Sequence, residues 1–146
     1  MWAERLPDKV RVSVGSAVVL GLTGGRLDAR PTTIYLLTHH PAGCVANCGF
    51  CPQARDSRGR ADMLSRVTWP PFPTRKVVAR VGDAYGGGAI SRVCVQALNY
   101  PTVLEDVLSI VEGIRGHSGV PISVCCQPLN RGRVERLSGA GVDRIG

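Results

Sequence analysis

The stretch RVCVQALNYPTVLEDVLSIVEGIRGHSGVPISVCCQ, residues 92–127, decides the fold class. It opens with the β-branched run 92–96 and closes with a second such run at 121–127. Between them, Thr102 and Glu105 form a capping box ahead of an apolar helical stripe that ends at a glycine. A strand, a helix and a second strand in this order predict a βαβ unit, and such units build parallel sheets.

Similar signals continue on both sides of this unit. Residues 33–38 are a run of β-formers, residues 74–85 place apolar side chains on one helical face, and Asn130 can cap a short helix before a last apolar run at 142–145. We therefore expect an α/β protein, a partial TIM-like (βα) barrel of about four parallel strands with outer helices.

The same pattern predicts how the chain is divided. Residues 33–146 are expected to form the N-terminal part of the barrel, and residues 1–32 an N-terminal covering segment. The final strand would leave a bare sheet edge, which folded domains normally cover or pair. We therefore expect the chain to be truncated, as the front part of a longer barrel.

The composition indicates a globular protein of a reducing compartment. Of 146 residues, 44% are hydrophobic and 5% aromatic. The six cysteines are too few and too unevenly placed for a secreted disulfide scaffold. The N-terminus lacks a signal-peptide layout, and the apolar stretch 17–22 is far shorter than the ~20 residues of a membrane span. We expect a cytoplasmic protein with no membrane partner.

The net charge of +7 is weak evidence for nucleic-acid binding. Sixteen of the 18 basic residues are arginine, and the densest group is interrupted by Asp56 and Asp62 without interleaved aromatic residues. A basic lip can instead attract a carboxylate or phosphate of a small substrate. Nucleic acid is therefore not the expected partner.

The strongest chemical signal is a C-x3-C-x2-C loop formed by Cys44, Cys48 and Cys51, with Phe50 before the last cysteine. Three thiolates can hold three irons of a [4Fe–4S] cube and leave one iron open to a substrate, whereas ordinary cluster electron carriers use four cysteines. A zinc site would need a second ligand pair, although one of the two preceding histidines could join Cys44. Zinc and buried apolar cysteines are the alternatives to the open-iron cluster.

Two further cysteines are predicted to share the polar face of the sheet. By strand alternation, Cys94 and Cys125 lie late in neighbouring strands on that face, whereas Cys126 lies with the apolar core residues. In a βα barrel the polar face is the interior near the C-terminal rim. Two interpretations are equally open: the pair fills the barrel as small hydrophobic side chains, or it holds part of a second iron–sulfur cluster.

The run GCVANCGFCP at 43–52 resembles the cluster loop of the radical S-adenosylmethionine enzymes. Its continuation into Gln53, together with the segments 92–101 and 137–143, is similar to the biotin synthase branch of that superfamily. The segment 94–101 is one residue shorter than in true biotin synthases. It is closer to the biotin-synthase-related group of archaea, some of whose members resemble half of a two-protein lipoyl synthase.

This resemblance implies a mechanism and a set of site residues. The open iron of the loop cluster would bind S-adenosylmethionine, and an electron from the cluster would give a 5′-deoxyadenosyl radical that abstracts a substrate hydrogen. Phe50 would lie beside the adenine and Ala97 would help to seat the methionine part. Cys94 and Cys125 would ligate an auxiliary [2Fe–2S] cluster, which is the sulfur donor in biotin synthases.

The resemblance also implies partners and leaves two other functions open. A ferredoxin or flavodoxin would supply electrons, the substrate would be a small molecule or an acyl-carrier-bound group, and a second radical S-adenosylmethionine subunit would complete the assembly. The expected reaction is C–H activation with sulfur insertion. The alternatives are a non-catalytic iron–sulfur or zinc-binding module and an inactive truncated fragment.

Overall fold

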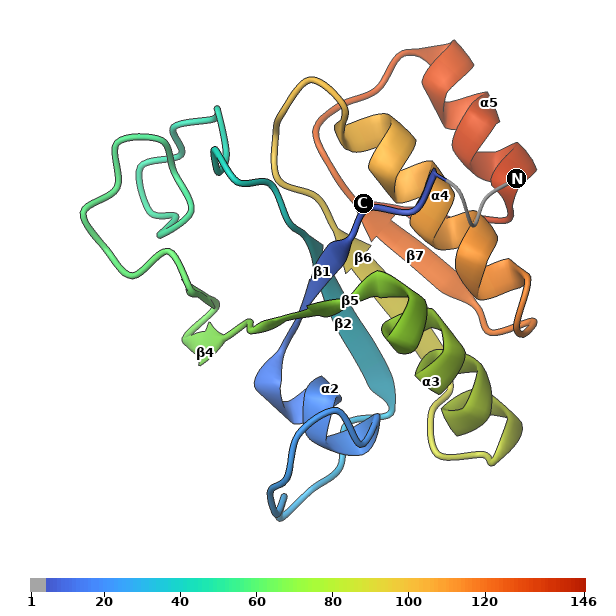
Figure 1. Cartoon of the computed structure of the whole chain (residues 1–146). Coiled ribbons are helices and arrows are strands. Elements are labelled where there is room, and N and C mark those ends of the chain that lie inside the picture. The colour runs from blue at the N-terminus through green and yellow to red at the C-terminus, as the bar shows by residue number, and fades with distance from the viewer. Residues whose placement is uncertain (1–4) are drawn as a thin grey trace.

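A computed structural model describes residues 5–146 as a mixed α/β fold, with four helices and a mostly parallel six-stranded sheet (Figure 1). The sheet strands are β1 (Lys9–Val12), β2 (Thr33–Thr38), β5 (Pro71–Pro73), β6 (Arg92–Gln96), β7 (Ile122–Cys125) and β8 (Arg144–Ile145). The helices are α2 (Val14–Val19), α3 (Thr74–Gly86), α4 (Val103–Arg115) and α5 (Arg131–Ala140). A small separate hairpin pairs β3 (Met63–Leu64) with β4 (Val67–Thr68).

The strand order is β5-β1-β2-β6-β7-β8. Strands β2, β6, β7 and β8 are parallel neighbours, and α3, α4 and α5 connect them in turn. The strands and helices predicted from residue 33 onward are therefore confirmed, as is the α/β class. Among the helices of residues 5–146, none is long and apolar enough to cross a membrane.

The N-terminal segment does more than the expected covering role. Strand β1 pairs antiparallel with β2 and extends the sheet, and α2 follows it directly. Residues 1–4 of this segment lie outside the described residues. The proline-rich stretch before α3 pairs with β1 as strand β5. Prolines are tolerated there because an edge strand need not donate to a further neighbour.

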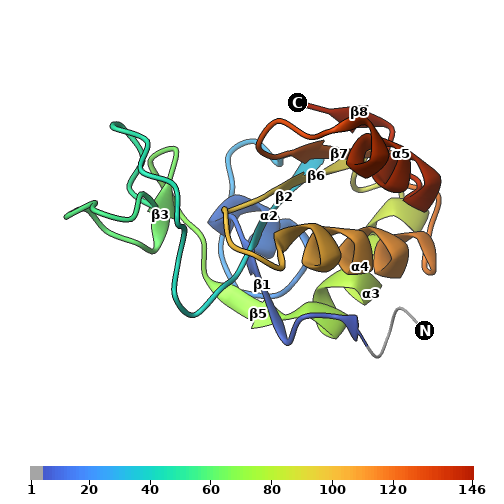
Figure 2. The ribbon, with the colours of Figure 1, turned by 90° about the horizontal axis from the view of Figure 1, so that it is seen from above.

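The two faces of the sheet differ as strand alternation requires. One face carries side chains that are entirely buried with the helices, namely Val10, Val12, Ile34, Leu36, Val93, Val95, Ile122 and Val124. Figure 2 shows α3 and α4 side by side along the sheet, while the segment that contains β3 extends away from this body. The opposite face carries Arg11, Cys94 and Gln96, so the sheet presents its polar side chains away from the main core.

The helix ends follow local chemistry with one exception. Asn130 caps α5 as predicted, because its side-chain oxygen accepts from the Arg133 amide at 2.9 Å. The capping box predicted for α4 is wrong, since the Thr102 side chain makes no capping hydrogen bond. Thr102 has φ −97° and ψ 12°, far from the extended backbone that aims an N-cap hydroxyl at the helix amides.

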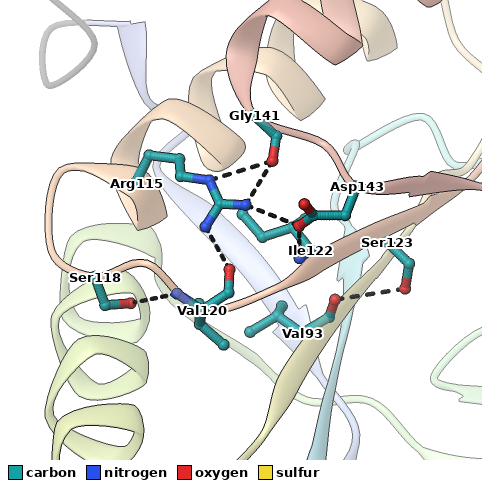
Figure 3. A network of polar contacts seen from close by, with 8 residues as sticks. All are labelled: Val93, Arg115, Ser118, Val120, Ile122, Ser123, Gly141 and Asp143. Carbon is teal, nitrogen blue, oxygen red and sulfur yellow. Dashed lines mark hydrogen bonds and ion pairs between the residues drawn. The ribbon is translucent and has the colours of Figure 1, made fainter.

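Arg115 ties the C-terminal end of α4 to the connections that lead into β7 and β8 (Figure 3). Its guanidinium donates to the Gly141 carbonyl at 2.6 Å, to the Val120 carbonyl, and to the Asp143 carboxylate at 2.9 Å. Asp143 also accepts the Ile122 amide at 2.8 Å. Gly141 has φ 107°, and a Cβ there would lie 2.6 Å from Arg115 Nε, so this corner requires glycine.

Candidate metal and cofactor site

The candidate site lies where the parallel strands β2, β6 and β7 end. The loop after β2 carries the three-cysteine motif, the loop after β6 begins at Ala97, and β7 ends at Cys125. In Figure 1 the loop after β2 extends away from the helical body. Ligand sites of parallel α/β sheets form at this carboxyl edge because the connecting loops meet there.

One cavity of about 320 Å³ brings most of the predicted site residues together. Its walls include Cys44, Cys48 and Cys51 from the loop, Ala97 after β6, and Cys125 at the end of β7. We call it the cysteine cavity. These residues come from three segments that are far apart in the sequence, so their convergence is a property of the fold.

Two predicted residues do not line this cavity. Phe50 is 94% exposed and does not line the cavity, although Cys48 and Cys51 on either side of it in the sequence do. Cys94 is buried, with 8% of its surface exposed, and its sulfur contacts that of the lining residue Cys125.

The loop cysteines share the cavity without forming a finished ligand set. Cys48 is exposed, whereas Cys44 and Cys51 are half-buried. Within residues 5–146, no three His, Cys, Asp or Glu side chains are close enough together to hold a metal ion. Metal binding would therefore draw the three sulfurs inward, which the exposed position of Cys48 permits.

The first cysteine is held by the main chain of the loop after β6. The Asn99 amide donates to Cys44 Sγ at 3.2 Å, and the Asn99 carbonyl accepts from the Val45 amide at 2.7 Å. These two bonds hold the start of the motif against the sheet. Hydrogen bonds to cysteine sulfurs also tune the reduction potential of an iron–sulfur cluster.

A buried polar network that sequence reasoning missed fixes the far end of the loop. Arg11 of β1 donates to Gln53 Oε1 at 2.9 Å, to the Ala61 carbonyl at 2.7 Å and to the Trp69 carbonyl at 3.0 Å. Gln53 donates in turn to the carbonyls of Ala61 and Met63, at 2.6 and 2.7 Å. The sequence does carry a signal for this network. Strand alternation places Val10 and Val12 on the core face, and therefore Arg11 between them on the opposite face of the strand.

The prediction that Cys94 and Cys125 share a face is confirmed. Their sulfurs lie 3.8 Å apart across β6 and β7. Partial burial, followed by the neighbouring Cys94 and then Cys126, raises the pKa of the Cys125 thiol. Cys126 packs against the main core, as predicted.

The sulfur separation suits a shared metal better than a covalent bond. Two thiolates on one tetrahedral metal, with metal–sulfur bonds of about 2.3 Å, are about 3.8 Å apart. The register pairs Cys94 with Ser123 and Gln96 with Cys125, so the two cysteines are diagonal neighbours. Diagonal backbones are about 7–8 Å apart, beyond the reach of an unstrained disulfide.

The two histidines before the motif face a different cavity. His39 and His40 line a space of about 680 Å³ together with Arg11 and Trp69, and Cys44 is not part of it. His40 stacks on Tyr100 with ring centroids 4.4 Å apart, and Tyr100 donates to Asp106 at 2.7 Å. Burial, and then the positive charge of Arg11, lower the pKa of His39. The structure therefore does not assemble the alternative zinc site of Cys44 with a histidine.

An apolar cavity of about 410 Å³ adjoins the cysteine cavity. The two spaces share Ala97, Asn99, Cys126 and Gln127. Helices α4 and α5 supply much of the apolar wall, and Arg133 adds a positive charge. The site therefore has room for a ligand that reaches from the cysteines to an apolar chamber.

No known family model matches the chain, and no curated protein matches it either. The functional argument therefore depends on the residues of the site and on their geometry.

Proposed function

We propose that this chain is part of a radical S-adenosylmethionine enzyme of the biotin synthase-like or lipoyl synthase-like type. The observation that carries the proposal is the cysteine cavity, because Cys44, Cys48 and Cys51 line it together at the carboxyl edge of a parallel sheet. Three cysteines on one loop match the donor set of a cluster with one open iron.

The donor chemistry of the site fits such a cluster. Thiolates are the usual ligands of iron–sulfur clusters, and the Asn99 amide already points at Cys44 Sγ. When bound, the cluster and S-adenosylmethionine would supply the electron and the 5′-deoxyadenosyl radical for C–H activation. The protein would position the cofactor and exclude water.

Other residues take supporting roles in this proposal. Ala97 lies on the wall shared by the two cavities, which suits contact with the methionine part of the cofactor. Phe50 is exposed and would have to fold over the adenine when the cofactor binds. The sulfur separation of Cys94 and Cys125 supports a second, [2Fe–2S] cluster that donates sulfur.

The fold and partners of the whole protein follow from the same proposal. The parallel strands β2, β6, β7 and β8, with their outer helices, would be the first part of a TIM-like barrel. The partners would be a cytoplasmic ferredoxin or flavodoxin, a small-molecule or acyl-carrier-bound substrate, and a second radical S-adenosylmethionine subunit.

The test is anaerobic reconstitution of the chain with iron and sulfide, followed by reduction in the presence of S-adenosylmethionine. We expect a brown protein that releases 5′-deoxyadenosine, measured by mass spectrometry, and a Cys48→Ala variant that does neither. A colourless protein that binds one tight zinc ion would contradict the proposal. An iron-loaded protein that yields no 5′-deoxyadenosine would favour a non-catalytic metal-binding module, which the spacing of Cys94 and Cys125 also allows.

A further inference from the structure

Arg11 is an unusual residue in this fold. Only 7% of its surface is exposed, and it is the one charged side chain that is buried within residues 5–146. An isolated buried charge costs several kcal/mol unless other groups compensate for it. The position of Arg11 therefore requires an explanation in terms of the groups around it.

The surroundings of Arg11 satisfy its hydrogen bonds without neutralising its charge. The three hydrogen bonds described for it go to uncharged oxygens, on Gln53, Ala61 and Trp69. The carboxylate whose charge partly compensates Arg11 is that of Asp62, which is exposed and binds Arg60 at 2.6 Å. Burial accordingly outweighs Asp62 and lowers the pKa of Arg11.

Gln53 connects this cation to the three-cysteine motif. It lies two residues after Cys51, is 92% buried, and lines the cysteine cavity on one side and the cavity beside Arg11 on the other. Both ends of its side-chain amide are hydrogen-bonded: the oxygen accepts from Arg11, and the nitrogen donates to two carbonyls. Arg11 therefore fixes the position of Gln53 and, through it, the end of the cysteine loop.

We propose that Arg11 is the positioning residue and the counter-charge of the metal site formed by Cys44, Cys48 and Cys51. Metal-bound cysteines are thiolates, so a metal-loaded loop carries negative charge at the cavity that Gln53 lines, and Gln53 also accepts a hydrogen bond from the buried cation. Arg11 then stabilises the metal-loaded loop by its charge and orders the loop by its hydrogen bonds. This inference rests on the proposed metal-binding function of the loop.

The experiment measures cobalt(II) binding to the reduced full chain under anaerobic conditions, by the thiolate-to-cobalt absorption. It uses a Cys94→Ser/Cys125→Ser background, so that the loop cysteines are the thiolate site under study. We expect Arg11→Gln to weaken cobalt binding by about 10-fold or more, the range for groups that support metal ligands. Arg11→Lys, which keeps the charge and loses the forked hydrogen bonding, should fall between Arg11→Gln and the parent.

A second measurement separates this role from a purely structural one. The reduction potential of the reconstituted loop cluster should become more negative in Arg11→Gln, since a nearby cation favours the more negative reduced state. Lys9→Gln removes one positive charge from an exposed position on the same strand and should leave both measurements unchanged.

The outcomes distinguish the two proposals. A parent protein that binds no cobalt, or binds it equally well after Cys48→Ala, overturns the metal-binding function itself. A parent that binds cobalt while folded Arg11→Gln matches it in affinity and potential overturns the role of Arg11. If Arg11→Gln does not fold, an Arg11→Lys loss of affinity smaller than 10-fold supports the charge, and a loss of 10-fold or more overturns it.

Discussion

Cys94 Sγ and Cys125 Sγ lie 3.8 Å apart on neighbouring parallel strands, and Cys125 lines the same cavity as the loop cysteines. If this pair ligates a second cluster, Cys94→Ser or Cys125→Ser should lower the iron content from about six to about four atoms per chain. Metal analysis after anaerobic reconstitution would measure this. Cys126→Ser is the matched control because Cys126 packs against the core. Equal iron contents in all three variants would contradict the second site.

Trp69 belongs to a small buried apolar cluster against which Cys44 of the cysteine loop packs. Its ring packs with Leu37, Leu98 and Tyr100, and its indole donates to the Leu64 carbonyl at 2.9 Å. Trp69→Phe should cost about 1 kcal/mol of unfolding free energy by removing this hydrogen bond. Trp69→Ala should cost about 3–5 kcal/mol because packing is lost as well. Urea denaturation would give both values, and hydrogen exchange should accelerate in residues 61–69.

Tyr100 should make stability fall in alkaline solution. Burial, followed by the hydrogen bond to Asp106, raises the pKa of this phenol in the folded state. Its contribution is fully present below the unfolded pKa of about 10 and is lost as pH rises through the folded value. Tyr100→Phe should therefore be about 1 kcal/mol less stable at neutral pH, with a difference that narrows above about pH 10. Unfolding curves at several pH values would show a constant difference if the hydroxyl were not responsible.

Asp143 should act in the opposite pH range. The Ile122 amide, and then Arg115, lower the pKa of this carboxyl. Its contribution is present above the unfolded pKa of about 3.9 and is lost as pH falls through the folded value. Asp143→Asn should cost about 1 kcal/mol at neutral pH and almost nothing in strong acid. Thermal unfolding would measure this, with Asp28→Asn as an exposed control; equal pH profiles would refute it.

Strand and helix positions after residue 33 could be predicted because the hydrophobic periodicity and the capping and turn residues indicate the same boundaries there. Asn130, Gly116 and Gly141 mark helix ends by local chemistry that does not depend on the rest of the fold. The paired face of Cys94 and Cys125 follows from strand alternation alone.

Features that depend on distant segments escaped sequence reasoning. Strand β1 was not predicted because its partner lies more than twenty residues away, and β5 was not predicted because prolines disfavour strands. Arg11 and Gln53 are 42 residues apart in the sequence, so no local sequence pattern predicts their hydrogen bond. The exposed position of Phe50 was likewise not predictable, because the motif defines spacing and leaves the path of the loop open.

Two main-chain hydrogen bonds of Asn99, one to Cys44 Sγ and one from the Val45 amide, form what we call the clasp on Cys44, and they place a particular constraint on position 99. Because Asn99 holds the first cysteine with its peptide N–H and C=O, the identity of its side chain is irrelevant to these two bonds. Most substitutions there would preserve the clasp, and only proline, which has no N–H, would remove the bond to sulfur. Residue 99 can therefore change in evolution without loss of these two bonds, and a comparison of side chains alone would overlook one of the supports of the site.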